Sequence, residues 1–406
     1  MAAAIGAGEA LSARIVESIA DIAAPAWDAL VASASPEPED INPFLSHAFL
    51  LALQASGCAV PDTGWQTRFL VLERDGILAG ALPLYGKTHS WGEFVFDWAW
   101  ADAYRRHGLA YYPKWIAAVP FTPVSGPRLL AATPQDRARL MDAALDLARE
   151  AGVSSLHLLF PEEGQAREMA ARGMLLRRGV QFHWQNPGYA DFADYLAGLR
   201  QDKRKKVRQE RRKVNEAGIR FRRLTGADIR EADWHHFLAC YLRTHRQFNS
   251  PPALNLDFFL RLGATMPDNL LLVIAEREGE PIAAAFNLRN RSTLFGRSWG
   301  ALEYHPGLHF ETCYYQAIEY CIEHRIATFE GGAQGEHKLA RGFLPVTTWS
   351  AHWLAHPEFS RAVEDFLARE GAGMDGYLDE LNERNPFRRA PGNPAPAADT
   401  AERGLC

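Results

Sequence analysis

The sequence predicts an α/β protein (α+β in the arrangement of its strands) made of two similar lobes, each a mixed, mostly antiparallel sheet flanked by helices. Two observations carry this prediction: the same order of apolar periodicities occurs twice, and each half contains a strand pair closed by a charged glycine turn. The composition agrees, because 47% of the 406 residues are hydrophobic and 23% are charged, as in globular proteins that bury a large core.

The first half begins with a predicted strand and two helices, and three strands follow. Its turn signal is Asp75-Gly76, which is typical of a tight hairpin between alternating strands. A helix, a buried strand, another helix and a strand complete this half. The predicted ranges are, in order, 13–18, 24–32, 45–56, 67–74, 77–85, 93–100, 134–151, 155–160, 162–172 and 180–184.

The second half repeats this order, with Glu278-Gly279-Glu280 as the hairpin turn. Its predicted strands and helices span 219–224, 228–244, 256–262, 270–277, 281–289, 292–299, 311–325, 327–330 and 350–355. The repeat places one lobe at residues 1–186 and the other, opening on a basic helix, at 187–384. Residues 385–406 are rich in Pro, Ala and Gly without any period, and we expect a disordered tail there.

Composition narrows the classes of function. No apolar run approaches the roughly 18 residues that a membrane-spanning helix needs. The five cysteines form no CxxC pair, which argues against a disulfide framework or metal site and favours a cytoplasmic protein. The net charge of −5 argues against a general nucleic-acid binder, and no DNA partner is predicted. No tightly bound cofactor is expected.

The repeated order of strand, two helices, three-strand meander, helix and strand resembles the GNAT acyltransferase fold. That resemblance implies a donor site where two strands splay apart before a helix, whose N-terminus attracts phosphate. Acyl-CoA is the implied co-substrate. The usual R/Q-x-x-G-x-G/A signature is missing, and residues 303–311 (EYHPGLHFE) stand in its place. Arg297 and Trp299 before this segment, with His309 and Glu311 at its end, are predicted to shape the donor site.

A glycine-rich segment at 329–345 (FEGGAQGEHKLARGFLP) concentrates chemistry-bearing residues. Its glycines allow a close backbone approach to a ligand, and Gly332 and Gly335 are predicted to contact the donor. Lys338 and Arg341 are predicted to bind the reacting carbonyl or a donor phosphate. Glu336 or His337 is the predicted base that takes the proton of an attacking amine. The alternative interpretation is a glycine loop capped by solvated charges.

This segment also resembles the C-terminal motif of the Fem-type transferases, which move amino acids from aminoacyl-tRNA to peptidoglycan precursors. The match is Lys338-Leu-Ala-Arg341-Gly-Phe343, and the nearest subfamily is one of Fem-like predicted N-acyltransferases. The resemblance covers about residues 40 to 370 and implies two tandem GNAT-like lobes, without naming a substrate. Further matching segments lie at 63–65, 83–104, 111–115, 120–130, 181–184, 202–212 and 308–319.

A polar and aromatic stretch in the first half is predicted to hold the amine acceptor. It contains His89, Glu93, Asp97 and Asp102, and the predicted strand 93–100 puts Glu93 and Asp97 on one face. A structural ion-pair network is the alternative. The proline-rich segment 120–130 nearby is interpreted as a rigid loop that lines a cleft or braces the lobes.

The segment 203–213 (KRKKVRQERRK) is predicted to be a helix with positive charge on three sides. Lys203, Arg204, Lys205 and Arg208 are predicted to hold phosphates of the donor. Those phosphates could belong to coenzyme A or to tRNA, and an acidic membrane surface is a further partner that this helix fits. The alternative is a solvated linker helix between the lobes.

Together these features predict an N-acyltransferase that moves an acyl or aminoacyl group from an activated donor to a small-molecule or peptide amine. Direct attack by the amine is expected, because no Ser-His-Asp pattern points to a covalent enzyme intermediate. Two alternatives stay open. One is a Fem-type transferase that uses aminoacyl-tRNA and acts on a peptidoglycan precursor. The other is a GNAT-like binding module without catalysis.

Overall fold

The computed structural model describes residues 11–35, 37, 38, 40–333 and 335–388. It has the predicted α/β class: a large mixed sheet and a smaller antiparallel sheet, both flanked by helices. Residues 385–388 of the predicted disordered tail are ordered, with a β-bridge between Phe387 and Leu199, and the rest of the tail, from 389 on, lies outside the described residues. No helix within the described ranges is long and apolar enough to cross a membrane.

The elements of the first half follow the predicted order except at 93–100, where no strand forms; α3 and β6 are added, and the strands predicted at 67–74 and 77–85 are each divided in two. They are β1 Leu11–Val16, α1 Ala24–Ala34, α2 His47–Ala55, β2 Trp65–Thr67, β3 Phe69–Arg74, β4 Ile77–Leu82, β5 Leu84–Lys87, α3 Trp98–Arg106, β6 Lys114–Ala117, α4 Pro134–Glu150, β7 Ser155–Leu159, α5 Glu163–Ala170 and β8 Leu175–Gln185.

The second half also keeps the predicted order and adds α6 and α12. Its elements are α6 Phe192–Gly198, α7 Gln201–Glu216, β9 Ile219–Thr225, α8 Glu231–Gln247, α9 Leu256–Thr265, β10 Leu270–Arg277, β11 Glu280–Arg289, β12 Thr293–Ala301, α10 Leu308–Phe310, a π-helical turn Glu311–Tyr315, α11 Gln316–Glu323, β13 Thr328–Glu330, β14 Phe343–Leu354 and α12 Pro357–Glu383.

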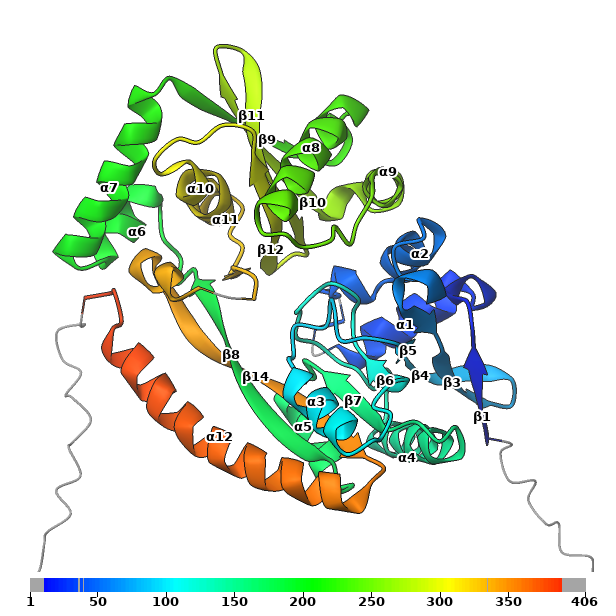
Figure 1. Ribbon diagram of the computed structural model, residues 1–406. Coiled ribbons are helices and arrows are strands. Elements are labelled where there is room, and N and C mark those ends of the chain that lie inside the picture. The colour runs from blue at the N-terminus through cyan, green and yellow to red at the C-terminus, as the bar shows by residue number, and fades with distance from the viewer. Residues whose placement is uncertain (1–10, 36, 39, 334, 389–406) are drawn as a thin grey trace, which may run out of the picture.

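The two halves exchange a strand. The 11-stranded sheet has the order β2-β5-β6-β7-β14-β8-β13-β12-β11-β10-β9. β8 ends the first half but pairs with β13 of the second, whereas β14 of the second half pairs with β7 of the first. The long strands β8 and β14 therefore join the two lobes into one sheet, as Figure 1 shows.

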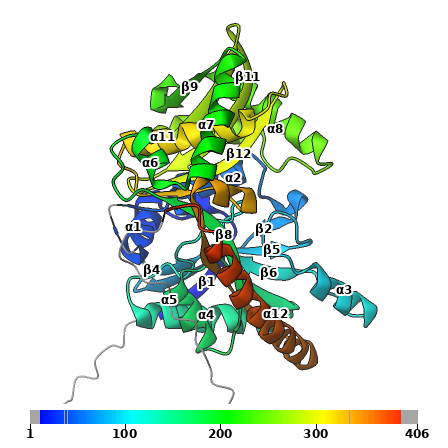
Figure 2. The same cartoon turned by 90° about the vertical axis from the view of Figure 1, so that its left-hand side faces the viewer.

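α12 lies along these two joining strands, which Figures 1 and 2 show from two sides. Its 27 residues pack against β8 and β14. Arg177 of β8 pairs with Glu370 at 2.7 Å, and Arg178 pairs with Asp375 at 2.6 Å. The helix thus covers the exchanged strands and ties them to the C-terminal part of the described chain.

The strand predicted at 93–100 is wrong: this segment is a loop that leads into α3 at Trp98. The side chains of Glu93 and Asp97 both turn inward to the buried Lys114 of β6, and Phe94 takes a positive φ of 62°. A strand would hold the two carboxylates in an extended row, whereas one shared ammonium draws them together. The ion pairs therefore decide the local conformation.

The proline-rich segment 120–130 is an ordered loop, because a buried arginine satisfies its main-chain carbonyls. The Arg128 guanidinium donates to the carbonyls of Leu159 at 2.7 Å, Gly126 at 3.1 Å and Pro127 at 3.2 Å, and also to that of Val124. Burial lowers the pKa of Arg128 to about 10. These hydrogen bonds hold the loop rigidly beside the end of β7, which carries Leu159.

Gly300 is required where β12 packs on α8. A Cβ at this position would overlap the main-chain carbonyl of Cys240, which cannot move without shifting α8. We expect Gly300→Ala to lower the free energy of unfolding by about 3 kcal/mol, as overpacking of a close contact does. Urea denaturation measures this change. Gly164→Ala in α5, where the added methyl meets open space, is the matched control and should be at least as stable as the native protein. Equal stability of the two variants would contradict the packing argument.

Candidate functional site

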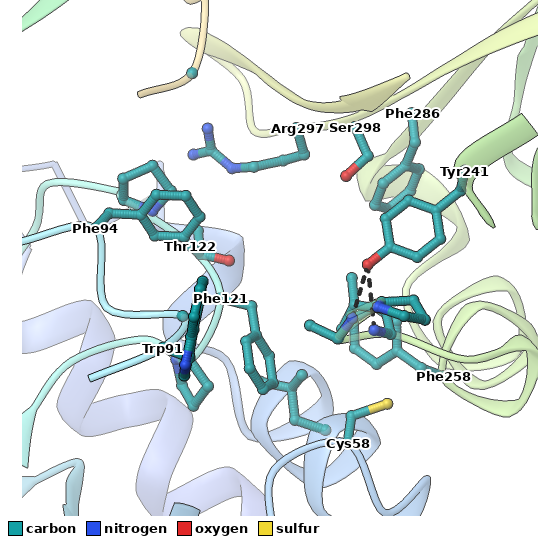
Figure 3. Close-up of a pocket in the computed structure, with 18 of the residues that line it drawn as sticks. Cys58, Trp91, Phe94, Phe121, Thr122, Tyr241, Phe258, Phe286, Arg297 and Ser298 are labelled. Carbon is teal, nitrogen blue, oxygen red and sulfur yellow. Dashed lines mark hydrogen bonds between the residues drawn. The ribbon is translucent and has the colours of Figure 1, made fainter. Parts of the chain in front are cut away.

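A cavity of about 570 Å³ lies between the two lobes, and both contribute to its wall. The first lobe supplies α2 and the loops at 89–94 and 120–123; the second supplies α8, α9, β11, β12 and the loop at 250–254. The wall is mostly apolar and rich in aromatic rings, and Figure 3 shows Phe121 opposite Tyr241, Phe258 and Phe286. Its size is that of a pocket for a drug-sized ligand.

A β-bulge places one charged side chain at this cavity. Along the β11–β12 pair, Phe286 faces Ser298 and Asn287 faces Gly296, so that Arg297 is the extra residue. Bulges of this kind redirect a side chain out of the regular alternation. In Figure 3 the Arg297 guanidinium points from the second lobe across the cavity, toward Phe94 and Thr122 of the first.

Beyond the bulge, β12 loses its neighbour on one side. β13 pairs with β12 in parallel only from Thr293 to Phe295, and it ends at Glu330. From Gly296 to Ala301, β12 keeps β11 as its partner among the described strands. The two strands thus part where Arg297 lies, which provides an open strand edge beside the cavity.

Arg297 is buried, and part of its hydrogen-bonding capacity is unused. Its side chain is 8% exposed, lies 4.5 Å over the Phe44 ring, and burial lowers its pKa to about 10. Nη1 donates to the carbonyl of Gly296 at 3.0 Å. Nε and Nη2 have no hydrogen-bond partner within the described part of the chain, and the nearest carboxylate oxygen, of Glu330, is 3.6 Å from Nη2.

A smaller hollow, which we call the neck, adjoins the cavity. It has a volume of about 80 Å³, shares Phe286, Gly296, Arg297 and Ser298 with the cavity wall, and is otherwise lined partly by Trp299, His309, Cys313 and Tyr314. Residues of β12 and of the helix that begins at Leu308 therefore face each other across it. The π-helical turn at Glu311–Tyr315 interrupts this helix at the neck, a feature often found at functional sites.

Besides Arg297 and Cys313, the neck has two titratable groups, a neutral imidazole and a protonated phenol. The His309 ring packs on Trp299, with centroids 4.5 Å apart, and burial lowers the pKa of His309 to about 4. Burial raises the pKa of Tyr314, whose hydroxyl lies 3.2 Å from Nε2 of His337. Burial also lowers the pKa of His337. The Tyr314–His337 contact connects the neck to a partly exposed imidazole.

Lys338 lies behind the cavity wall. Its ammonium donates to the carbonyl of Gly332 at 3.1 Å, and Gly332 itself lines the cavity. Burial and the nearby charge of Arg297 lower the pKa of Lys338 to about 8. A Cβ atom added at Gly331 would lie 3.2 Å from Cδ of Lys338, so the glycine turn and the lysine side chain fit closely together.

The other predicted catalytic residues are placed differently from Lys338 and His337. Arg341 is buried and pairs with Glu210 of α7 at 2.7 Å, with its guanidinium 3.3 Å over Phe310. Glu336 is exposed and pairs with Arg384 at 2.7 Å, next to α12. Arg341 and Glu336 thus hold α7 and α12, and neither lines the cavity or the neck.

The predicted donor residues divide into two groups. Arg297, Trp299, His309 and Gly332 line the cavity or the neck. Glu311 is buried against Arg211 at 3.0 Å, and Gly335, with a φ of 121°, precedes the turn at Glu336–Arg341. In α7, Lys205 and Arg208 are exposed, Arg204 is half-buried, and Lys203 pairs with Asp202 at 3.0 Å. These four basic residues line neither the cavity nor the neck.

The predicted acceptor residues lie in the same part of the first lobe, but the structure gives them different surroundings. His89 lines the cavity, and its Nε2 lies 3.0 Å from the carbonyl of Thr63. Glu93 and Asp97 are buried around Lys114, at 2.7 Å for Glu93. Burial raises the pKa of Glu93 to about 7. Asp102 lies on α3 and pairs with Arg106 at 2.9 Å.

Sequence reasoning missed Lys114, Glu330 and the hydroxyl of Tyr314. Lys114 stands alone among aromatic residues, and a single lysine in a strand gives no sign of the two carboxylates that approach it. Tyr314 has the spacing of an apolar helix face, which hides its polar end. No group of three or more metal-ligating side chains occurs within the described ranges.

Comparisons with known proteins match this geometry to a family and to solved folds. The family model FemAB_like, described as peptidoglycan biosynthesis/recognition, matches residues 18–389. The C-terminal domain of a putative lysylphosphatidylglycerol synthetase from Agrobacterium fabrum is 11% identical, with a TM-score of 0.53 over 86% of this chain and 96% of that one.

Two further solved structures are similar. FemX is 11% identical, with a TM-score of 0.52 over 84% of this chain and 98% of its own. A tandem GNAT protein from the clavulanic acid biosynthesis pathway covers 86% of this chain and 99% of its own at 14% identity, with a TM-score of 0.46. Comparison with curated proteins gives no match. At this identity and with TM-scores above 0.5, the synthetase domain and FemX show the fold alone.

Proposed function

The chain belongs to the FemAB_like family, and from this premise we propose that it is an N-acyltransferase in which an amine attacks an activated acyl group at the neck. Acyl-CoA is the donor that we propose first. The observation that carries the proposal is the opening of β12 from β13 at the bulge of Arg297, beside a neck that holds a neutral histidine and a protonated tyrosine. An open strand edge can pair with an extended donor arm.

In the proposed reaction the acyl carbonyl lies in the neck between β12 and the helix that follows it. The amine forms the new C–N bond, and its proton passes to the neutral imidazole of His309. The bond from the carbonyl carbon to the donor breaks, and the leaving thiolate takes a proton from the hydroxyl of Tyr314. His337, which contacts that hydroxyl at 3.2 Å, connects it to solvent for reprotonation.

Lys338 is a positioning residue in this proposal. It holds the Gly331–Gly332 turn through the carbonyl of Gly332 and contributes positive charge behind the wall where an oxyanion develops. Arg341 and Glu336 act further away, by fixing α7 and α12 to the segment that carries Lys338.

An aminoacyl-tRNA donor is the second candidate, and α7 is the observation that favours it. This helix has eight basic residues, and Lys205, Lys206 and Arg208 are exposed. It packs beside the loop that precedes α10, since a Cβ at Gly307 would lie 3.1 Å from the carbonyl of Glu210. Phosphates of either donor could be held there, near the start of the neck helix.

The first test is the thermal stability of the protein with coenzyme A, with acyl-CoAs from acetyl to palmitoyl, and with aminoacyl-tRNA. An acyl-CoA at a hundredfold its dissociation constant is expected to stabilise the protein by about 2.7 kcal/mol. The double variant K205E/R208E should weaken this effect, whereas Arg361→Glu on α12 is the matched control and should not. Release of free thiol in the presence of an amine then measures transfer.

The outcomes separate the two donors. Stabilisation by an acyl-CoA with thiol release supports the first proposal. Stabilisation by aminoacyl-tRNA alone, with transfer of its aminoacyl group, supports the second. A protein that neither donor stabilises and that transfers from neither is no transferase of this kind, and the proposal would fail.

A further inference from the structure

The cavity between the lobes combines an apolar wall with one buried cation. Phenylalanine and tyrosine rings from both lobes surround it, and Cys58 and Phe258 lie at the end away from Arg297 (Figure 3). Two wall residues of the first lobe, Phe94 and Phe121, have positive φ angles of 62° and 58°. Such angles are strained for aromatic residues and cluster at ligand sites.

One edge of the Arg297 guanidinium makes no hydrogen bond within the described residues and has the geometry to bind two oxygens. The unpartnered nitrogens Nε and Nη2 lie side by side on one edge of the guanidinium, and this edge meets both oxygens of a carboxylate in a bidentate pair. A buried arginine that leaves two donors unused loses the hydration that would compensate them. An anion in the cavity would restore those hydrogen bonds.

The charges around Arg297 leave room for such an anion. Glu330 forms an ion pair with Nη2 of Arg297 at 3.6 Å, which is longer than a hydrogen bond, and its Oε2 has no hydrogen-bond partner within the described residues. Lys338 adds a second buried cation. Its pKa is lowered to about 8, so the ammonium form still predominates at neutral pH. The neighbouring His183 is buried, and burial lowers its pKa. Two cations thus face one carboxylate.

The mouth of the cavity is apolar as well. Trp91 is 58% exposed and Phe94 is 39% exposed, although both line the cavity. Exposed aromatic side chains at a pocket favour ligands with a large apolar body. The ligand therefore needs an apolar part that lies against the rings and a single anionic group that reaches Arg297.

We propose that the interlobe cavity binds an amphiphilic carboxylate ligand, with its carboxylate on Arg297 and its apolar body against Phe121, Tyr241 and Phe258. This inference deepens the proposed function and rests on it for the ligand's role, as an acyl group that carries a second, distal carboxylate or as an amino acid that accepts the acyl group. Both sources share the same chemistry, a carboxylate on an apolar body.

Binding is measured by calorimetry on the full chain, without donor or amine, so that a failure of acyl transfer and a failure of this inference are distinguishable. The probes are decanoate, 1-decanol and decylamine, which differ only in the head group, and L-phenylalanine with phenethylamine, which lacks the carboxylate. We expect a carboxylate to bind at least tenfold more tightly than its matched neutral or cationic probe. Decanoate alone would identify an acyl source, and L-phenylalanine alone an amino-acid source.

Arg297→Gln should weaken the binding of the carboxylate probe at least tenfold. Arg297→Lys should recover part of this loss, because it keeps the positive charge but not the two parallel donors of the guanidinium. Arg277→Gln in β10, outside the cavity, is the matched control and should bind normally. Equal binding of decanoate and 1-decanol would overturn the inference, and so would a lack of binding of both carboxylate probes. Either result would mean that Arg297 takes no carboxylate ligand and that Glu330 is its anionic partner. That comparison uses the native protein, so it holds even where a variant fails to fold.

Discussion

Replacing Tyr314 by phenylalanine is expected to lower the rate of acyl transfer by about 100-fold or more, because the variant lacks the proton that the leaving group takes. The substitution removes one hydroxyl and keeps the ring, which packs on Phe343 with centroids 5.3 Å apart. The fold and the binding of donor should therefore change little. Single-turnover kinetics with thiol detection measures the rate, and thermal unfolding checks the fold.

Tyr320→Phe is the matched control, since Tyr320 lies in α11 on the same helical segment but outside the neck. It should transfer at the native rate. A Tyr314→Phe protein that turns over normally would exclude the hydroxyl from proton transfer. In that case a solvent molecule, or His309 alone, would have to supply the leaving group's proton.

Replacing Lys114 by methionine is expected to cost about 3–5 kcal/mol of stability, the effect of breaking a buried ion pair from one side. Lys114 is fully buried, and its ammonium is shared by Glu93 and Asp97 and by the hydroxyl of Ser90. Without it two buried carboxylates lose their shared cation, although Asp97 keeps the hydrogen bond from the Tyr111 hydroxyl at 2.6 Å. Urea denaturation at pH 7.5 measures the loss of stability. We also expect the cavity loop at 91–97 to become disordered in this variant.

Two comparisons make this prediction specific. Asp102→Asn breaks an exposed pair on α3 and should cost less than about 1 kcal/mol. Adding E93Q and D97N to Lys114→Met should recover part of the lost stability, because the uncompensated charges are then gone. A Lys114→Met protein as stable as the native one would instead favour the sequence-based hypothesis that Glu93 and Asp97 hold an acceptor amine.

The candidate site was predicted in part, and the reason differs from residue to residue. Arg297 and His309 flank a predicted strand end and helix start, so their place at the neck follows from local order along the chain. Glu336 and Arg341 lie in the same sequence cluster as Lys338, yet they pair with Arg384 and Glu210. Proximity in sequence could not reveal these partners, because α7 and α12 approach from distant parts of the chain.

The sequence by itself determined the α/β class, the repeated order of elements and most strand and helix positions, because hydrophobic periodicity and turn residues act over a few neighbours. Only the tertiary structure decided the exchange of β8 and β14, the loop at 91–97 and the cavity between the lobes. Each of these depends on contacts between residues far apart in the chain, such as Lys114 with Glu93 or Arg297 with the opposite lobe. Strand pairing and burial of charge, which no local pattern encodes, therefore fix the site.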